Sequence, residues 1–456
     1  MVLVAEAITQ MRGRSTIILL VLAAALGAYL YFIDAKKPVT DEKAKEKIFT
    51  ADATAVDQLE VKSATGEVTS LKKDSTGWTI VKPIQGPADQ NNASDVAASV
   101  ASLERDRVVD ENPTDLKAYG LAPPRIEVAF NVAGDKEPKR ILIGDKNPTS
   151  MGLYAKVPND KRVFLVSNGL ETSLNRSTFD LRDKTALKFD ATKVDAVELT
   201  SKNQTVRVVK TGDEWKLVKP LETPADYTSV EGLIGQLQSA QMMALKDKPE
   251  DLKDLKVYGL DKPEVTATLT SGTSSVVLQL GSAADTVTLW ARDPSKPAVF
   301  SIGNGLAEEL RKTVNDLRRK EIFDFRPFNA TRFEITRGKD TKVFERVKGT
   351  GANAPDTWKQ TAPVIKTVDA SNFEGALLEF SNLRADGFID KPDAATGVNS
   401  PIAIITVKFD EGKKEEQVKF GGTGVDTFAF RADRPGAMKL EMGKFDADLK
   451  KLDEIK

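Results

Sequence analysis

The chain has 456 residues and contains neither cysteine nor histidine. Without cysteine it can form no disulfide, no thiolate nucleophile, no cysteine-bound metal site and no cysteine-linked lipid anchor. Without histidine it lacks the usual acid/base of neutral pH and the commonest metal ligand. The two absences exclude Ser-His-Asp and Cys-His triads, zinc hydrolase sites and haem ligation. Any catalysis would rest on carboxylates, lysine, tyrosine or serine, so we expect no enzyme, no cofactor and no metal.

The chain also lacks an excess of charge of one sign. It has 66 basic and 67 acidic residues, so no chain-wide field attracts a polyanion. We therefore expect no nucleic-acid partner.

One long uncharged run is present, over residues 15–33. As a helix with a rise of about 1.5 Å per residue, this run is long enough to cross a bilayer once. Arg12 and Arg14 precede it and aromatic residues stand at its far end, which predicts a cytoplasmic N-terminus and a periplasmic bulk. We expect a single-pass protein of a bacterial inner membrane, with a cytoplasmic tail over residues 1–14.

A cleaved signal peptide is the alternative to this anchor, with a small-residue cleavage site at residues 25–28. The apolar run continues past that site into bulky aromatic residues, which favours an uncleaved anchor. Met11 is a second possible start of the chain. Residues 34–47 are highly charged and predict a solvated linker.

The rest of the chain repeats one phrase three times. Trp78, Trp215 and Trp358 each open a Trp-x-x-x-x-Pro stretch, and they lie 137 and 143 residues apart. A repeat of this length is a small domain rather than a solenoid unit. We expect three repeat domains, over residues 48–187, 188–324 and 325–456.

Within each repeat, apolar and polar residues alternate as in antiparallel strands, and one longer segment has helical spacing. The apolar positions of that segment fall at offsets of 0, 3, 4 and 7 in every copy. The fold class is therefore predicted as α+β, a mostly antiparallel sheet with a covering helix and a short terminal helix. Asp89, Asp226 and Asp369 stand where a helix N-cap belongs, which favours capping over catalysis.

A second motif, Tyr-Gly-Leu-x-x-Pro, follows the helix in the first two repeats. Gly120, Gly259 and the related Gly397 are predicted to end a helical turn in the left-handed conformation. The basic clusters at residues 181–184 and 317–320 are most simply solvated linkers, with a docking surface as the alternative.

Five aromatic residues are the candidates for a ligand or docking surface. The indole rings are predicted to pack at strand edges with a wet N–H, and stacking on a sugar or lipid is the alternative. The tyrosines precede the motif glycines, and Thr396 replaces them in the third repeat, which fits a packing role. The candidates are Trp78, Trp215, Trp358, Tyr119 and Tyr258.

An anchor followed by tandem Trp-x-Ile/Leu-x-x-Pro and Tyr-Gly-Leu-x-x-Pro motifs resembles the bacterial family of domain of unknown function 4340. The resemblance covers residues 48–456 and is weakest in the third repeat, which keeps only Gly397-Val398 and Pro401 of the second motif. It implies a membrane-anchored, extracytoplasmic protein that accompanies an ABC transporter of the gliding-motility type. It implies no catalytic residues.

These observations predict a non-enzymatic, membrane-anchored periplasmic accessory or scaffold protein. It would contact the bilayer through residues 15–33 and associate with membrane transporter subunits. A periplasmic lipid- or glycan-binding module is the alternative. A carboxylate-based hydrolase is the third, and it needs two acids that face a cleft about 5 to 10 Å apart.

Overall fold

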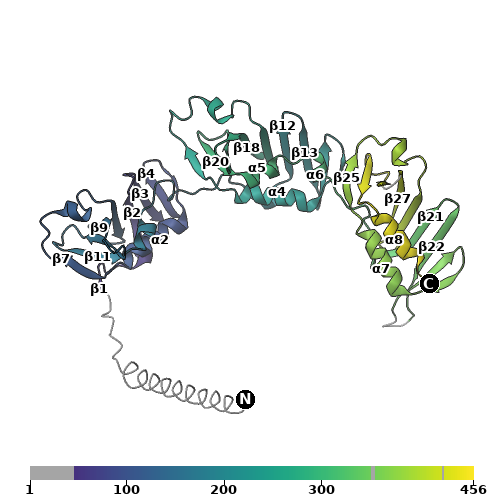
Figure 1. Cartoon of the computed structure of the whole chain (residues 1–456), viewed down its shortest axis with the longest axis horizontal. Helices are drawn as coiled ribbons and strands as arrows, with labels where there is room; N and C mark the ends of the chain where they lie inside the picture. The colour runs from purple at the N-terminus through teal and green to yellow at the C-terminus, as the bar shows by residue number, and fades with distance from the viewer. Residues whose placement is uncertain (1–45, 351–354, 424–425, 456) are drawn as a thin grey trace, which may run out of the picture. The chain divides into compact units, whose positions relative to one another are not determined.

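The computed structural model describes residues 46–350, 355–423 and 426–455. It contains three nine-stranded antiparallel sheets, one in each repeat, so the fold is mostly β with some α (Figure 1). The tail over residues 1–14, the anchor over 15–33 and nearly all of the linker over 34–47 lie outside the described residues. In the part that is described, no helix has the length and apolar character needed to cross a membrane. The described chain divides into two compact units between residues 183 and 184, and the second unit holds the second and third repeats.

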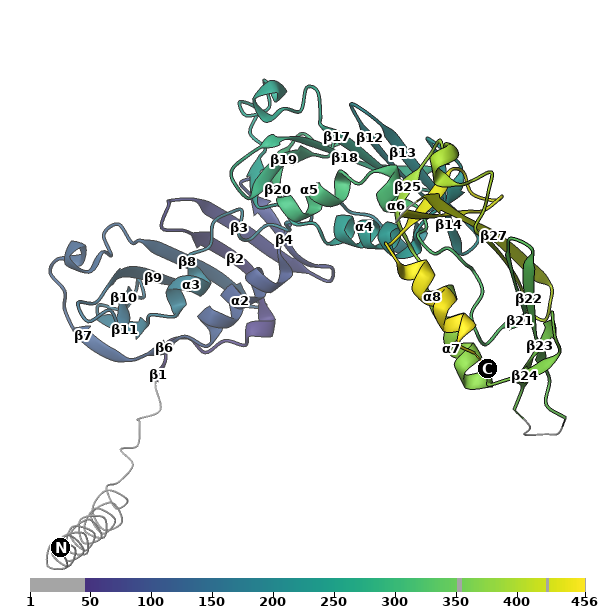
Figure 2. The same cartoon turned by 45° about the vertical axis from the view of Figure 1, so that its right-hand side comes forward.

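In the first sheet, strands that are far apart in the sequence are neighbours, and Figure 2 shows most of these strands. All neighbouring strands are antiparallel, and inward-facing apolar residues alternate with solvated ones. From one edge to the other the strands are β5 (Gly86–Pro87), β4 (Gly77–Lys82), β3 (Val68–Asp74), β2 (Val56–Lys62), β8 (Ile126–Val132), β9 (Lys139–Lys146), β10 (Gly152–Lys156), β11 (Val163–Ser167) and β7 (Arg107–Asp110).

The second and third sheets have the same order. In the second repeat the strands are β15 (Thr223–Pro224), β14 (Glu214–Lys219), β13 (Thr205–Thr211), β12 (Ala196–Ser201), β17 (Val265–Ser271), β18 (Ser274–Ala283), β19 (Thr288–Arg292), β20 (Val299–Gly303) and β16 (Ala244–Lys246). In the third they are β24 (Lys366–Val368), β23 (Thr357–Ala362), β22 (Asp340–Val347), β21 (Ala330–Arg337), β26 (Ala403–Phe409), β27 (Lys414–Thr423), β28 (Asp426–Phe430), β29 (Ala437–Leu440) and β25 (Ala385–Ile389).

Helices cover one face of each sheet (Figure 1). They are α2 (Gln90–Ala101) and α3 (Leu170–Leu174) in the first repeat, α4 (Tyr227–Ser239), α5 (Asn304–Leu310) and α6 (Val314–Leu317) in the second, and α7 (Ala370–Ser381) and α8 (Lys444–Asp453) in the third. In α2, α4 and α7 the buried residues include all those at the predicted offsets. The predicted N-caps are confirmed, because each aspartate side chain accepts a backbone N–H of its helix.

Each repeat begins with an extended segment that pairs with the chain following its main helix. The amide of Ile48 donates to Leu103, that of Ala186 to Ala240 and that of Ile322 to Leu383. In the first repeat this pairing includes β1 (Glu46–Lys47) and β6 (Glu104–Arg105). The boundaries expected after residues 47, 187 and 324 lie within or next to these segments.

The motif glycines take the predicted left-handed conformation, and the turn that each one ends is a 3-10 turn. Gly120, Gly259 and Gly397 have φ values of 66°, 68° and 72° and end η3 (Leu116–Tyr119), η5 (Leu255–Tyr258) and η6 (Ala394–Thr396). Only glycine adopts this conformation without steric cost. Two further 3-10 turns, η2 (Ala53–Ala55) and η4 (Ala191–Lys193), precede the first long strands of the first and second repeats.

Candidate functional site

The three repeated tryptophans lie in the hydrophobic cores. Trp78 and Trp215 are 2% exposed and Trp358 is 0% exposed. Their rings pack under the helices of their own repeats, and a sugar or lipid has no free ring face to stack on. The aromatic residues that mark the repeats are therefore core residues in this structure.

The indole N–H groups have partners in two of the three repeats. Trp215 donates to the Glu231 carboxylate at 2.9 Å, and Trp358 donates to the Glu374 carboxylate at 3.3 Å. A serine, Ser94, stands at the position of these glutamates in the first repeat. It is too short to reach the ring, and the buried Nε1 of Trp78 has no hydrogen-bond partner among the described residues.

A cation lies over each of these rings. Lys73, Lys210 and Arg346 stand 5.7, 5.4 and 4.9 Å from the ring centroids of their tryptophans. Lys210 and Arg346 also pair with the glutamates that accept the indole N–H. These contacts hold the helix against the hairpin that carries the tryptophan.

The two motif tyrosines make packing contacts with neighbouring aromatic rings. Tyr119 meets Tyr154 and Tyr258 meets Trp290, each at 5.0 Å between ring centroids and nearly perpendicular. The Tyr119 hydroxyl donates to Asp110 at 2.9 Å, and this hydrogen bond raises the pKa of Tyr119. Tyr258 is buried, and this burial raises its pKa as well. The five predicted site residues are thus divided among three repeats, and no single site collects them.

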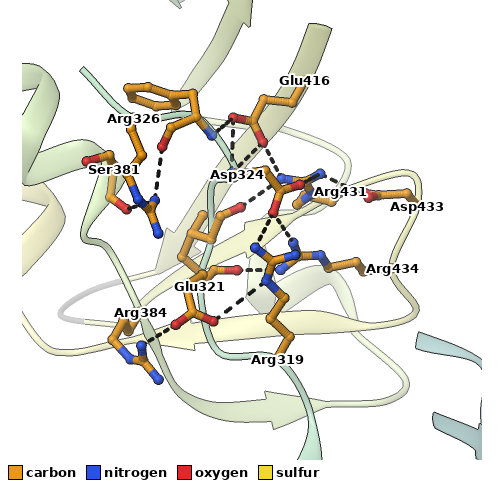
Figure 3. Close-up of polar contacts among 12 residues, drawn as sticks. Arg319, Glu321, Asp324, Arg326, Ser381, Arg384, Glu416, Arg431, Asp433 and Arg434 are labelled. Atoms are coloured by element: carbon orange, nitrogen blue, oxygen red, sulfur yellow. Dashed lines mark hydrogen bonds and ion pairs between the residues drawn. The ribbon is translucent and has the colours of Figure 1, made fainter. Parts of the chain in front are cut away.

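Charged residues form a network at the junction of the second and third repeats, and Figure 3 draws most of its members. We call it the joint network. It joins four arginines to five carboxylates, so its charges nearly cancel. Its members are Arg319, Arg384, Arg431, Arg434, Asp226, Glu321, Asp324, Glu416 and Asp433.

The centre of the joint network is a buried ion pair. The guanidinium of Arg431 lies 2.5 Å from the Glu416 carboxylate, and their side chains are 6% and 3% exposed. Glu416 also accepts the backbone N–H groups of Asp324 and Phe325, each at 2.9 Å. Arg431 contacts the carboxylates of Asp324 and Asp433 at 2.9 Å. Burial opposes the charge on Arg431, but these carboxylates outweigh it and raise its pKa.

The outer part of the joint network connects the two repeats. Arg319 follows the last helix of the second repeat and lies 3.0 Å from Asp324. Arg384, from the third repeat, pairs with Glu321 and lies 3.6 Å from the N-cap carboxylate Asp226 of the second repeat. Burial, together with the charge of nearby Arg431, lowers the pKa of Arg434 to about 10, so Arg434 stays cationic at neutral pH.

Arg318 contacts the third repeat at the same junction, beside the joint network. It is 1% exposed, lies 4.1 Å above the Phe388 ring, and donates to Asp390 and to the carbonyl of Pro435 at 2.7 Å. The prediction that residues 181–184 and 317–320 are solvated linkers is wrong, since Leu181 and Leu317 are also buried. The sequence signal that could have predicted this burial is the leucine with which each basic cluster begins.

A groove of about 760 Å³ opens beside the joint network. Its walls come from β14 and β15 of the second repeat and from the third repeat. Its lining includes both acids and bases, among them Glu214, Lys216, Glu222, Asp410 and Lys414. In the described chain, no cluster of three or more metal-ligating side chains is present.

The sequence matches the description "Domain of unknown function (DUF4340)" twice in tandem, over residues 78–216 and 215–401. The chain belongs to the DUF4340 family. The two matches cover the Trp and Tyr-Gly-Leu motifs of the first two repeats and extend into the third. No curated protein matches this DUF4340 chain.

Solved structures similar to the DUF4340 chain include DNA polymerase sliding clamps. One, from Pseudomonas aeruginosa with a ligand, is 7% identical, with 86% of this chain and 92% of that chain covered and a TM-score of 0.16. A putative DNA polymerase III beta subunit from Eubacterium rectale is 8% identical, with 88% and 93% covered and a TM-score of 0.17. Superpositions this poor carry no argument about the DUF4340 chain.

Proposed function

We propose that this chain is a non-enzymatic accessory or scaffold protein, anchored in a bacterial inner membrane through residues 15–33, with its repeats in the periplasm. It associates with an ABC-type transporter of the gliding-motility type. The repeats serve as spacers and as docking surfaces for the transporter subunits.

The joint network is the observation that carries this proposal. Domains that act independently of one another need no specific contact between them. Here Arg318 and Arg384 each form an ion pair with a carboxylate of the neighbouring repeat. A buried ion pair adds little net stability over apolar packing, but it can fix the orientation of the elements that it joins. A fixed orientation between repeats is what a spacer requires.

The charged residues that a carboxylate hydrolase would use have structural roles instead. Asp89, Asp226 and Asp369 accept helix N–H groups at 2.8 to 2.9 Å. Glu416 is bound by Arg431 and two backbone amides. These contacts support a structural protein over a catalyst.

A pull-down of the full-length chain from gently solubilised membranes tests the proposal. Proteins and lipids in the eluate are identified by mass spectrometry, beside a control chain that lacks residues 1–47. We expect transporter subunits with the anchored chain and none with the control.

Recovery of the chain from membranes without any transporter subunit would contradict the proposed association. Recovery of a lipid or glycan on both forms, without a protein partner, would favour the binding-module alternative, with the groove at the joint network as its first candidate site. Release of the full-length chain by carbonate washing would contradict the anchor.

A further inference from the structure

Each repeat contains a hairpin of two neighbouring strands, β2–β3, β12–β13 or β21–β22, and the strand register fixes which positions correspond. In this register one residue of the second strand lies directly across from a core residue of the first. These residues are Thr69, Val206 and Lys342, across from Val61, Leu199 and Ile335. The corresponding side chains differ in polarity, and this difference decides how the turn of each hairpin is connected to the rest of its repeat.

In the first repeat, hydrogen bonds connect this hairpin to the segment that follows α3. The hydroxyl oxygens of Thr69 and Thr178 lie 2.7 Å apart and share a hydrogen bond. The amide of Ala64, in the hairpin turn, donates to the Asn175 side chain at 2.8 Å. The amide of Thr178 donates to the Glu67 carboxylate at 2.9 Å. The hairpin turn is therefore closed against the segment after the helix.

In the third repeat, ion pairs make the corresponding connection. Lys342 lies 2.8 Å from the carboxylate of Asp453, the last residue of α8. Arg337, at the end of β21, donates to the same carboxylate at 2.8 Å. Both the first and the third repeat thus connect the hairpin to the helical segment beside it through polar side chains.

The second repeat lacks this polar connection. Val206 is 1% exposed and lies in the hydrophobic core, and Val314 packs against the same core in the place that Thr178 has in the first repeat. The Ser201 hydroxyl donates within its own turn. Among the described residues, no hydrogen bond or ion pair joins the turn over residues 201–204 to residues 310–313.

A pocket of about 430 Å³ opens at this place in the second repeat. Its buried lining is apolar and consists of Leu199, Val265 and Leu310. Its outer lining is polar, with the turn over residues 201–204 on one side and residues 311–313 on the other. Small-molecule sites of about 300 to 1,000 Å³ typically combine an apolar lining with a few polar groups. The pocket therefore fits a small molecule with one apolar and one polar end.

The charges at the pocket leave one cation without a partner. Glutamates beside the pocket form ion pairs with Arg311 and Lys312. Lys202 is exposed and forms no ion pair with a described residue. The amide side chains of Asn203 and Gln204 follow it in the same turn and also line the pocket. An anionic head group at this rim would therefore meet an uncompensated ammonium group and two amide donors.

We propose that this pocket of the second repeat binds a small anionic amphiphile, with an apolar chain inside the pocket and a carboxylate or phosphate head beside Lys202. A free fatty acid and a membrane phospholipid share this chemistry. The pocket has no lining residue in common with the groove at the joint network. The proposal goes beyond the accessory role and depends neither on the membrane anchor nor on the transporter association.

Photolabelling of the purified full-length chain in phosphatidylcholine nanodiscs tests the proposal. The probe is decanoic acid with a diazirine at the end of its chain, and mass spectrometry locates the label, which we expect at residues 199–206 and 310–314. Unlabelled decanoate should compete at least about tenfold better than decanol, a difference of about 1.4 kcal/mol, because decanol offers no anion to Lys202. Suppression of labelling by phosphatidylglycerol in the nanodiscs identifies a membrane lipid as the source of the ligand, and labelling that phosphatidylglycerol leaves unchanged identifies a free fatty acid.

Two variants separate the contacts of the head and of the chain. Lys202→Glu reverses the charge at the rim, and Lys253→Glu, at another exposed lysine of the same repeat, is its control. Ser201→Trp fills the pocket, and Thr200→Trp is its control, because neighbouring residues of a strand point to opposite faces of the sheet. The corresponding position of the third repeat carries the large side chain of Arg337, so we expect the fold to accept a bulky residue at Ser201.

Lys202→Glu should weaken competition by decanoate at least about fivefold, which is about 1 kcal/mol, and Ser201→Trp should abolish labelling. Both controls should behave as the natural chain does. Hydrogen exchange of α5 in each variant shows whether the second repeat is folded. Labelling spread evenly over the three repeats, equal competition by decanoate and decanol, or equal labelling of a folded Ser201→Trp and its control would overturn the proposal.

Discussion

The hydrogen bond between Trp215 and Glu231 offers the sharpest test of how these repeats are stabilised. Replacing Glu231 with serine reproduces what the first repeat has naturally, because Ser94 occupies that position. The change leaves the buried indole N–H of Trp215 without its 2.9 Å acceptor and also removes the partner of Lys210. We expect the second repeat to lose stability and the other two repeats to keep theirs.

The magnitude follows from the burial of the two groups. A buried donor that loses its acceptor costs about 1 to 3 kcal/mol. The Glu231 side chain is 32% exposed, so water can reach the site and the lower half of that range applies. The surface pair with Lys210 contributes less than about 1 kcal/mol. We expect a total loss of about 1 to 3 kcal/mol for Glu231→Ser.

Native-state hydrogen exchange with mass spectrometry measures this loss repeat by repeat, with the first and third repeats as internal references. Glu231→Gln is the control, because it keeps the acceptor for the indole and removes only the charge; it should cost less than half as much. Ser94→Glu should conversely slow exchange around Trp78. If Glu231→Ser leaves exchange in the second repeat unchanged, or if Glu231→Gln costs as much, the hydrogen bond is not what stabilises this helix.

Three further predictions address other parts of the fold. Burial raises the pKa of Asp448 above its ordinary value of 3.8, so the stability that the protonated side chain contributes is fully present below pH 3.8 and is lost as the pH rises through the raised pKa. Asp448→Asn should therefore be more stable than the natural chain at pH 7, and a pH series of urea melts should show the stabilities of the variant and the natural chain converging toward pH 3. Gly281→Ala places a Cβ against a backbone carbonyl oxygen and should lower the free energy of unfolding by about 1 to 3 kcal/mol. Gly232→Ala, on the open face of α4, should raise it by up to about 1 kcal/mol. Thermal melts measure both changes, and equal effects of the two substitutions would refute the argument from close backbone approach. Arg431→Met leaves Glu416 buried without its cation and should cost about 3 to 5 kcal/mol in the third repeat, measured by hydrogen exchange; a loss below 1 kcal/mol would mean that water reaches the pair.

The sequence by itself determined the features that depend on neighbours in the chain. The spacing of Val230, Leu233, Ile234 and Leu237 predicts the buried face of α4, because residues three and four apart share one side of a helix. Asp226 predicts its N-cap and Gly259 its left-handed turn for equally local reasons. Repetition of these signals established three copies of one fold.

Only the tertiary structure decided which distant segments meet. Strand β7 is four residues long and pairs with β11 more than fifty residues away, a contact that no local pattern encodes. The joint network likewise depends on Glu416 and Arg431 facing the start of the third repeat across the sheet. The burial of Leu317 at the end of α6, rather than in a solvated linker, follows from its packing in the hydrophobic core of the second repeat. Strand pairing and ion pairing are long-range contacts, and a sequence without its fold leaves their partners open.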